Sequence, residues 1–565
     1  MAVALVADGR LDVRVRLDER SAGYMALGAG LATGVPAVVL TTSGTAAAEL
    51  HPAVVEADLA RVPLIVCTAD RPPELQSVGA PQTIAQRALY GASVRWSLEA
   101  GVPEEAVRAT WRSLGSRVVA EAAAGPSGPG PVHVNLALRE PLLGPAGSSV
   151  ELPPGRAHDR PWHRVTPSRR VPPARLLDDL GHLLTSARRG VIVAGARCGD
   201  PDAVLAAAAR LGWPVLADPR SGCRRSAPPP TVVVAAADAL LRDDAFRAAH
   251  RPEVVLRLGE PAASKVLAGW FADTAAGGTV HIVTDPDWTW RDPGREAAFH
   301  VACDPDELLA VAPSAAGARA TAVSDWARSW ASGEDAAQQA IDALLAGGEE
   351  LTEPFVARHV AQCKGVGTIV VASSMPVRDL EWFAKPVDRP PRVLSNRGAN
   401  GIDGVASTCL GVAAASADTG ATVGILGDLA FLHDLSAFVR PDAAEEWPPC
   451  VFVVVDNHGG GIFSFLPQAS QLEEARFERL FGTPQGPDVA SVARGLGAKV
   501  MEAGTRMGFE EMFARALSLV SGARGDGESG PVVVVARTDR DRNVQVHDEL
   551  NAAVRAAALA ARSGD

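Results

Sequence analysis

Short runs rich in valine, isoleucine and leucine alternate with alanine-rich stretches along almost the whole chain. This alternation is typical of parallel sheets built from strand–helix–strand units, whose strands are buried on both faces. A chain of 565 residues is also too long for one hydrophobic core. The runs form three groups, at 13–19, 36–44, 62–70 and 131–136; at 190–199, 213–222, 254–260 and 279–286; and at 367–374, 421–428, 450–457 and 531–538. The sequence therefore predicts an α/β protein with three doubly wound parallel-sheet domains.

Two stretches without this pattern separate the groups. Residues 152–173 are rich in proline and arginine, a composition typical of a linker. A less patterned, alanine-rich stretch at 312–350 leads into the third group. We therefore predict a first domain at 1–150, a linker at 151–175, a central domain at 176–320 and a third domain at 345–565. In such sheets ligands bind at the carboxyl ends of the strands, so we expect functional residues directly after the runs.

Composition excludes several classes of protein. The net charge of −12 argues against a nucleic-acid partner. The seven cysteines are scattered, odd in number and never in CxxC spacing, which favours reduced thiols in a cytoplasmic protein. No uninterrupted apolar run reaches the roughly 18 residues that a membrane span needs. The opening MAVALVADGR has no basic leader, so we do not expect it to be a signal peptide.

Two strand ends in the third group carry residues suited to a metal and a phosphate. The first reads Gly427–Leu429 (GDL) and the second Asp456–Gly461 (DNHGGG). Mg²⁺ prefers about six oxygen ligands and often shares them with phosphates. Asp428 offers a carboxylate, Asn457 an amide oxygen, and the turn near Gly459 a backbone carbonyl, while the glycines let the main chain approach a diphosphate. On these residues alone, two turns with capping side chains remain the simpler interpretation.

Longer strings extend the pattern over nearly the whole chain. They are LDERSAGYMALG (17–28), TTSGTAAAELHPAVVEA (41–57), TADRPPEL (68–75), LSNRGANGIDGVAST (394–408), GDLAFLHDLSAF (427–438) and VVVDNHGGGIFSFLP (453–467). In this order they resemble the family of 2-succinyl-5-enolpyruvyl-6-hydroxy-3-cyclohexene-1-carboxylate synthases of menaquinone biosynthesis, which are thiamine-diphosphate (ThDP) enzymes. The sequence departs from the usual ThDP motif at Leu429, where a glycine is expected, and at Asp456, where an asparagine is expected.

The resemblance implies a fold, cofactors, substrates and an assembly. The first domain would bind the pyrimidine of ThDP and the third its diphosphate, with Mg²⁺ or Mn²⁺ as the metal. The enzyme would decarboxylate 2-oxoglutarate and add the succinyl unit to isochorismate. The family's active sites lie between subunits, so the resemblance implies a homodimer or a dimer of dimers.

The resemblance also assigns roles to single residues. Glu19, at the end of the predicted strand 13–19, matches the catalytic glutamate, which reaches the cofactor of another subunit and hydrogen-bonds its aminopyrimidine. Ile402 matches the apolar residue that supports the bent cofactor. The other matched cofactor-binding residues are Ser374, Leu429, Gly460 and Ile462, with Asp428, Asn457 and Gly459 at the metal. The matched substrate-binding residues are Arg71, Gln82, Lys265, Ser374, Arg378, Arg397, Ile462 and Phe463.

Each of these residues also has a simpler explanation. Glu19 can cap a helix, Ile402 can be a core side chain, and a lone arginine is most often a solvated surface group. Arginine nevertheless suits substrates with several carboxylates, because its planar guanidinium binds them bidentately. The three arginines follow predicted strands, which favours the functional interpretation.

Relatives in that family begin with a strand and a PGSR-like turn that this sequence lacks. We expect the first strand of the first domain to be missing, roughly 30 residues or one strand–helix unit, through a late start codon or as a genuine variant. Two alternative functions stay open: an acetolactate-synthase-like ThDP enzyme that uses pyruvate, and a non-catalytic ThDP-fold protein. Nucleotide binding after 191–199 (VIVAGARCG) is disfavoured, because no GxGxxG follows.

Overall fold

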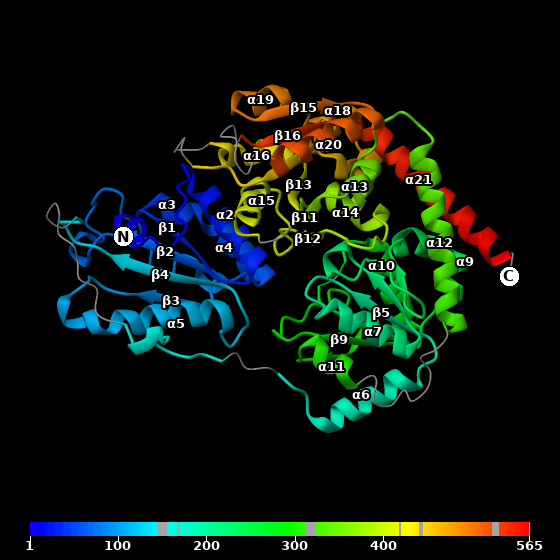
Figure 1. The fold of residues 1–565 in the computed structure, drawn as a ribbon, viewed down its shortest axis with the longest axis horizontal. Coiled ribbons are helices and arrows are strands. Elements are labelled where there is room, and N and C mark those ends of the chain that lie inside the picture. Colours follow the sequence, from blue (N-terminus) through cyan, green and yellow to red (C-terminus); the bar gives the residue numbers. More distant parts are fainter. Residues whose placement is uncertain are drawn as a thin grey trace.

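Three parallel sheets, each flanked by helices, make up the computed structural model of the chain (Figure 1). It describes residues 1–143, 155–166, 170–260, 262–311, 323–416, 420–439, 445–522 and 530–563. Within these residues the first sheet has four strands and the other two have six each. Every strand pairing is parallel, which confirms the predicted fold class.

The first sheet has the strand order β1-β2-β4-β3. Its elements are α1 (Ala2–Asp8), α2 (Glu19–Thr33), β1 (Ala37–Thr41), α3 (Thr45–Glu49), α4 (His51–Ala60), β2 (Leu64–Asp70), β3 (Trp96–Glu99), α5 (Trp111–Ala124) and β4 (Pro131–Ala137). Strand β1 forms one edge, and among the described residues no strand precedes it in the chain.

The predicted strand at 13–19 is wrong. Residues 12–16 have no regular structure, and Glu19 is the first residue of helix α2, with Asp18 as its N-cap. The alternation of apolar and charged side chains at 13–17 is a strand pattern, but this segment pairs with no described strand. Its apolar side chains are exposed, and Arg16 pairs instead with Glu445 at 2.8 Å. A strand needs a neighbour to satisfy its backbone, and the sequence pattern alone does not supply one.

The middle sheet has the order β10-β9-β8-β5-β6-β7. Its elements are α6 (Ala174–Ser186), β5 (Gly190–Ala194), α7 (Pro201–Leu211), β6 (Pro214–Ala217), β7 (Val232–Val234), α8 (Ala237–Leu241), α9 (Asp244–Ala249), β8 (Val254–Leu258), α10 (Lys265–Ala276), β9 (Val280–Thr284), β10 (Ala297–Val301), α11 (Pro305–Val311) and α12 (Asp325–Ala346). The described part of the predicted linker contains no strand.

The third sheet has the order β12-β11-β13-β14-β16-β15. Its strands are β11 (Val366–Val371), β12 (Arg392–Leu394), β13 (Ala421–Gly427), β14 (Cys450–Asp456), β15 (Lys499–Ala503) and β16 (Val532–Arg537). Its helices are α13 (Glu353–Gln362), α14 (Met375–Phe383), α15 (Val405–Ala415), α16 (Asp428–His433), α17 (Gln468–Gln471), α18 (Glu474–Phe477), α19 (Val489–Gly495), α20 (Arg506–Gly522) and α21 (Arg540–Ser563).

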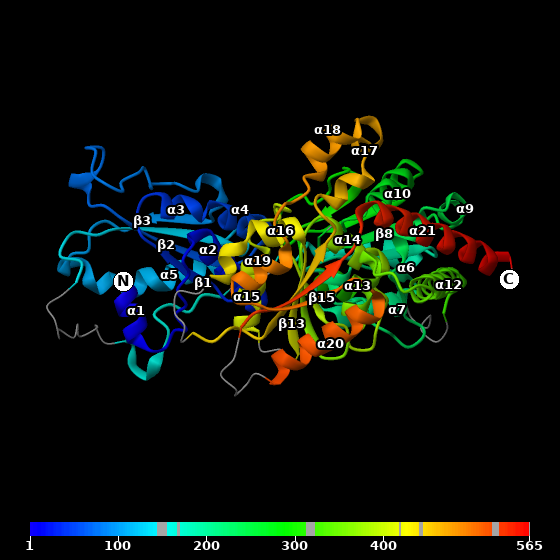
Figure 2. The ribbon, with the colours of Figure 1, turned by 90° about the horizontal axis from the view of Figure 1, so that it is seen from above.

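The alanine-rich stretch at 312–350 contains the long helix α12, which packs against the last helix, α21 (Figures 1 and 2). Trp330 and Ile341 of α12 share a buried cluster with Leu550 and Val554 of α21 and with strands of the middle sheet. The end of the chain therefore packs on the middle sheet. Burial of these apolar side chains is the main driving force for that return.

Helices α2 and α15 bring the first and third sheets together through backbone contact. A Cβ atom on Gly28 would lie 2.1 Å from the carbonyl oxygen of Thr408, and one on Gly411 would lie 2.0 Å from that of Met25. Only glycine fits at these two positions. The helices consequently approach more closely than any side chain would allow.

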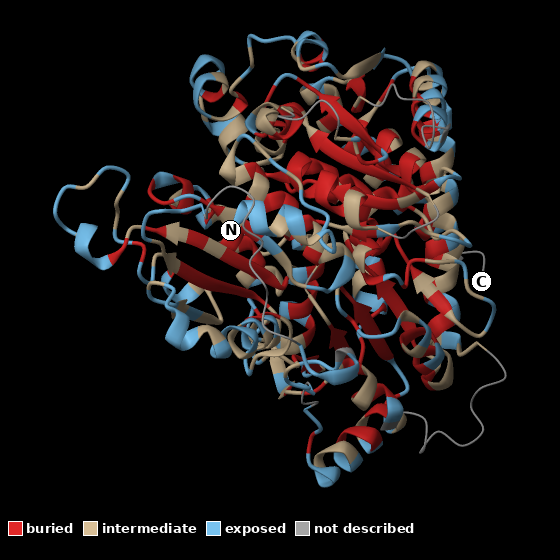
Figure 3. Cartoon of the chain, turned by 60° about the vertical axis from the view of Figure 1, so that its left-hand side comes forward, coloured by how far each residue is buried: buried red, intermediate tan, exposed pale blue. Residues whose placement is uncertain are grey.

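Buried residues concentrate in the three sheets and in the helices between them (Figure 3). The seven cysteines are all free thiols. In the described part of the chain, no helix combines the length and the apolar character needed to cross a membrane.

Candidate cofactor and substrate site

The carboxyl ends of four neighbouring strands of the third sheet carry most of the predicted site residues. The order β12-β11-β13-β14 places the segments after these strands at one edge. Those segments contain Arg397, Ser374, Asp428 and Asn457 respectively. Because the strands are parallel, residues from four distant parts of the sequence meet there.

Asp428 links the two predicted motifs. It is the first residue of α16, and its carboxylate accepts the backbone N–H groups of Leu429 and Gly459, each at 2.7 Å. The side chain is buried. Burial raises the pKa of Asp428 to about 6, although the two N–H groups act in the opposite direction. The structure thus joins the GDL and DNHGGG segments, which follow the neighbouring strands β13 and β14.

The turn at 458–461 has a backbone that few residues can adopt. Gly459 has φ of 131°, and a Cβ atom there would lie 2.0 Å from the carbonyl oxygen of Gly482. The Gly460 N–H donates to the same carbonyl at 2.8 Å. Glycine is required for this close approach, and the turn leads directly into the short helix Gly461–Phe465, which carries Ile462 and Phe463.

Asn457 has one end of its amide paired and the other end unpaired. Its Nδ2 donates to Oε1 of Glu353 at 2.7 Å, whereas its Oδ1 is buried and has no partner within the described residues. A buried oxygen without a donor suits a cation. In the described ranges no three histidine, cysteine or acidic side chains are placed so that they could hold a metal ion together, so a metal held by Asp428 and Asn457 would need further oxygen ligands. Diphosphate oxygens supply such ligands, and the residues present therefore fit a metal–diphosphate pair.

Two predicted arginines meet near this edge. Arg378 lies one turn inside α14, and its guanidinium donates to the carbonyl oxygen of Ser374 at 2.6 Å. The sequence predicted that Arg378 directly follows a strand. Arg378 instead lies in a helix, because Ser374 is the N-cap of the helix that follows β11. The pKa of Arg397 is lowered, first by burial and then by the positive charges of Arg220 and Arg378. Neighbouring guanidinium groups of this kind form a site for an anion.

The loop that carries Arg397 is held from the first sheet. The Glu56 carboxylate accepts the N–H groups of Gly398 and Ala399 at 2.8 and 2.7 Å. At the other end of the loop, the Tyr24 hydroxyl donates to Asp403 at 2.5 Å. Sequence reasoning did not identify Tyr24 and Glu56 as loop contacts, because nothing in their residue type signals a partner hundreds of positions away.

Ile402 lies in the same loop. It is partly buried and packs against the core cluster that includes Val405 and Phe431. Its position beside a core cluster is compatible with both explanations given to it, the core side chain and the support for a cofactor.

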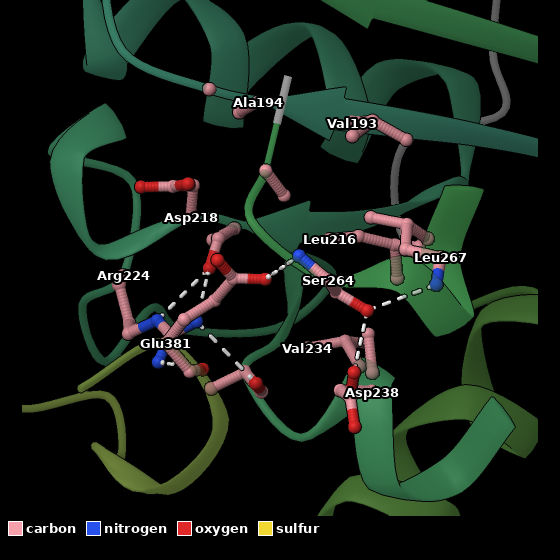
Figure 4. A pocket seen from close by; sticks show the side chains of 15 residues that line it. Val193, Ala194, Leu216, Asp218, Arg224, Val234, Asp238, Ser264, Leu267 and Glu381 are labelled. Carbon is pink, nitrogen blue, oxygen red and sulfur yellow. Dashed lines mark hydrogen bonds between the residues drawn. The ribbon is translucent and has the colours of Figure 1, made fainter. Parts of the chain in front are cut away.

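Helix α14 is also held from the middle sheet (Figure 4). The Glu381 carboxylate accepts the N–H groups of Ala263 and Ser264 at 2.7 and 3.1 Å. Arg224 donates in return to carbonyl oxygens around the end of α14, among them that of Glu381 at 2.8 Å. Burial raises the pKa of Glu381 to about 7. These contacts surround the small cavity of Figure 4 and fix the helix that carries Arg378.

Two further predicted residues meet at the carboxyl end of the first sheet. Arg71 directly follows β2, and its Nε donates to the carbonyl oxygen of Pro81 at 3.4 Å. Gln82, with φ of 57°, donates through Nε2 to the carbonyl oxygen of Ser43 at 2.9 Å. The structure therefore brings Arg71 and the loop of Gln82 together.

Glu19 and Lys265 make no hydrogen bond or ion pair with the other predicted site residues in the described part of the chain. The residue after Glu19, Arg20, donates to the carbonyl oxygen of His433 at the far end of α16. Between described residues, no hydrogen bond or ion pair joins Glu19 to Asp428 or Asn457. Lys265 is the exposed first residue of helix α10, which connects β8 and β9 of the middle sheet. Direct contacts between described residues of one chain thus do not link all the predicted residues.

The fold and the site define a class of protein. Residues 2–89 match the thiamine pyrophosphate enzyme N-terminal TPP binding domain, 156–368 the middle domain of thiamine pyrophosphate enzymes, and 381–536 their C-terminal TPP binding domain. The chain is thus an α/β protein of the thiamine-pyrophosphate enzyme class.

Similarity to curated proteins identifies the family within this class. Three proteins named 2-succinyl-5-enolpyruvyl-6-hydroxy-3-cyclohexene-1-carboxylate synthase are similar to this chain. The protein from Chloroflexus aurantiacus is 41% identical (87% of this chain, 82% of the relative), that from Myxococcus xanthus 40% (94% and 89%), and that from Thermobifida fusca 41% (99% and 94%). The chain belongs to this synthase family.

Proposed function

We propose that this chain is a 2-succinyl-5-enolpyruvyl-6-hydroxy-3-cyclohexene-1-carboxylate synthase. It would decarboxylate 2-oxoglutarate, release CO₂ and transfer the succinyl unit to isochorismate in menaquinone biosynthesis. The observation that carries this proposal is the 41% identity to the Thermobifida fusca synthase over 99% of the chain. The buried, unpartnered oxygen of Asn457 beside the Asp428 loop supports it independently.

The third domain would hold the cofactors. Asp428, the Oδ1 of Asn457 and a backbone carbonyl near Gly459 would bind Mg²⁺ or Mn²⁺. The glycine turn, together with Leu429, Ser374 and Ile462, would hold the diphosphate and thiazolium of ThDP, with Ile402 against the ring system. ThDP, when bound, supplies an electron sink for the decarboxylation.

The chain's own residues would bind the substrates and move one proton. Glu19 would hydrogen-bond the aminopyrimidine of a cofactor held by another subunit and fix its protonation state. The carboxylates of the substrates would bind to the guanidinium groups of the site, since each offers a planar pair of donors. The proposed substrate contacts are Arg71, Gln82, Lys265, Ser374, Arg378, Arg397, Ile462 and Phe463.

The proposed assembly is a homodimer, or a dimer of dimers, with active sites between subunits. Two observations support it: no hydrogen bond or ion pair joins Glu19 to Asp428 or Asn457 among the described residues of one chain, and the opening segment exposes apolar side chains such as Val3, Val6 and Leu17. We propose domain boundaries at 1–150, 176–320 and 345–565 and a cytoplasmic location, which the free cysteines favour.

The test is to incubate the purified chain with Mg²⁺, ThDP, 2-oxoglutarate and isochorismate and to follow the loss of isochorismate absorbance. We expect loss that requires 2-oxoglutarate and disappears in Glu19→Gln. Consumption of pyruvate without isochorismate would instead support the acetolactate-synthase-like alternative. No turnover of any 2-oxoacid would leave the non-catalytic alternative.

A further inference from the structure

We propose that Glu353 is a positioning residue that orients the Asn457 amide so that its oxygen faces the metal. This inference rests on the proposed function, since it concerns a metal at Asp428 and Asn457. It adds a residue from α13, which no predicted motif contained.

Glu353 is fixed where it can act on the amide. It is the first residue of α13, its side chain is only 2% exposed, and its Oε1 accepts Nδ2 of Asn457 at 2.7 Å. Thr538 directly follows β16, and its hydroxyl donates to the same oxygen at 3.4 Å. A buried carboxyl group held by two donors has little freedom to move away from the amide.

The amide of asparagine has two ends of nearly equal size and opposite hydrogen-bonding character. The nitrogen only donates and the oxygen only accepts. The Oε1 of Glu353 accepts, so it selects the nitrogen end and directs Oδ1 of Asn457 to the opposite side. A half-turn of the amide would place two acceptors against each other and turn a donor toward the cation. Glu353 therefore selects the orientation that binds a metal.

The space around the amide agrees with this role. A Cβ atom on Gly461 would lie 2.7 Å from Nδ2 of Asn457, so the nitrogen end is closely surrounded by Gly461 and Glu353. The oxygen end is buried but has no donor from any described residue. An amide whose nitrogen is paired and whose oxygen has no donor is what a preset cation ligand requires.

The experiment measures Mn²⁺ binding to the full chain at saturating ThDP, by the electron paramagnetic resonance signal of free Mn²⁺. Glu353→Met removes the acceptor with little change in volume and should weaken Mn²⁺ about 10–100-fold, the usual cost of losing such a partner. Glu353→Gln keeps a carbonyl acceptor and should stay within about threefold of the unsubstituted protein. Glu334→Met is the matched control: Glu334 is also a buried acceptor, for the N–H of Ala236, but it lies in helix α12, away from the candidate metal site.

A second substitution separates orientation from simple structural support. Asn457→Asp presents an oxygen in both orientations, so it makes an orienting partner unnecessary. Added to Glu353→Met, the substitution Asn457→Asp should raise the Mn²⁺ affinity at least about tenfold over that of Glu353→Met alone. A residue that only supported the local fold would not be bypassed in this way.

Three results would overturn the inference: normal Mn²⁺ affinity in Glu353→Met, equal weakening by Met and Gln, or no recovery with Asn457→Asp. If Glu353→Met does not fold, Glu353→Asp replaces it; its carboxyl group is one methylene too short, and normal Mn²⁺ affinity there would overturn the inference. If the unsubstituted chain with ThDP binds no Mn²⁺, the proposed function itself fails. If the unsubstituted chain binds Mn²⁺ and the Glu353 variants bind it equally well, only the role of Glu353 is refuted.

Discussion

The carboxylate of Glu56 accepts the backbone N–H of Gly398 at 2.8 Å across 342 positions of sequence. Glu56 belongs to α4 beside the first sheet, whereas Gly398 follows the candidate substrate residue Arg397 in the third. The Glu56 side chain is buried, the contact itself is partly buried, and a Cβ atom on Gly398 would lie 2.9 Å from the Glu56 carbonyl oxygen. One domain thus determines the shape of a binding loop in another.

This contact predicts the effect of Glu56→Gln. The amide can replace one acceptor oxygen but turns a donor toward the other N–H, which leaves two donors facing each other at a partly buried contact. We expect a loss of about 1–3 kcal/mol in the free energy of unfolding and a raised KM for isochorismate. Thermal unfolding and steady-state kinetics measure the two effects. The control is Glu49→Gln, because Glu49 is exposed and lies nearby; it should change stability by less than about 0.5 kcal/mol. An unchanged KM in Glu56→Gln would contradict the role given to the loop.

Metal binding should depend on Asp428. In Asp428→Asn an amide nitrogen meets one of the two backbone N–H groups, and the negative charge that attracts the cation is lost. We expect Mn²⁺ affinity to fall at least about 100-fold and ThDP retention with it. Dialysis against a chelator should likewise abolish activity of the unsubstituted protein, and Mg²⁺ with ThDP should restore it. Asp200→Asn, at the N-cap of α7, is the control and should bind Mn²⁺ normally.

The contact between α2 and α15 predicts a strong effect of one methyl group. Gly28→Ala would drive its Cβ atom into the carbonyl oxygen of Thr408 at 2.1 Å, and backbone atoms cannot swing aside as a side chain can. We expect a loss of about 3 kcal/mol or more. Gly115 lies in α5 with no atom within 4 Å of its Cβ position, so Gly115→Ala should stabilise by about 0.4–1 kcal/mol. Differential scanning calorimetry measures the change in stability of each variant. Equal changes would show that α2 and α15 can move apart without loss of stability.

Acid should destabilise the protein through buried histidines. Burial lowers the pKa of His250 from 6.5 to about 4, and that of three others, His133, His281 and His547, to about the same value. The unfolded chain takes up a proton near pH 6.5 while the folded chain resists until about pH 4. The folded state therefore loses stability as pH falls through this window, by at most about 3 kcal/mol for each histidine.

The test is the melting temperature between pH 7 and pH 4. His250 stacks on Phe246 and contacts the Ser329 hydroxyl at 2.7 Å, and glutamine can keep that contact without titrating. His250→Gln should lower stability at pH 7 but lose less of it on acidification. The matched control substitution is His51→Gln, at an exposed histidine. Parallel curves for His250→Gln and the unsubstituted protein would refute the assignment.

Local pattern was sufficient for much of the fold. Runs such as 450–457 predicted buried strands, because a parallel strand with both faces covered must be apolar at successive positions. The short strands β3, β7, β10, β12 and β15 lay outside the predicted runs. All five are sheet-edge strands, and their short sequences carry little signal. The segment 13–17 shows the converse: it has a strand pattern but no neighbour.

The candidate site divides in the same way. Asp428 and Asn457 were predictable, since both directly follow strands that the sequence identifies and parallel topology brings strand ends together. Glu353 was not, because it contacts Asn457 from 104 positions away and begins an ordinary helix. Residue type at one position contains no information about which distant backbone or amide it will meet.

The sequence by itself determined the three parallel sheets, the family and the residues at the strand ends, because each depends on local hydrophobic pattern or on strings of neighbouring residues. Only the tertiary structure decided that α21 returns to the middle sheet, that Glu56 holds the loop of Arg397, and that Glu353 selects one end of the Asn457 amide. These are contacts between distant segments. Their energies arise from close packing and from the burial of polar groups, which exist only once the chain has folded.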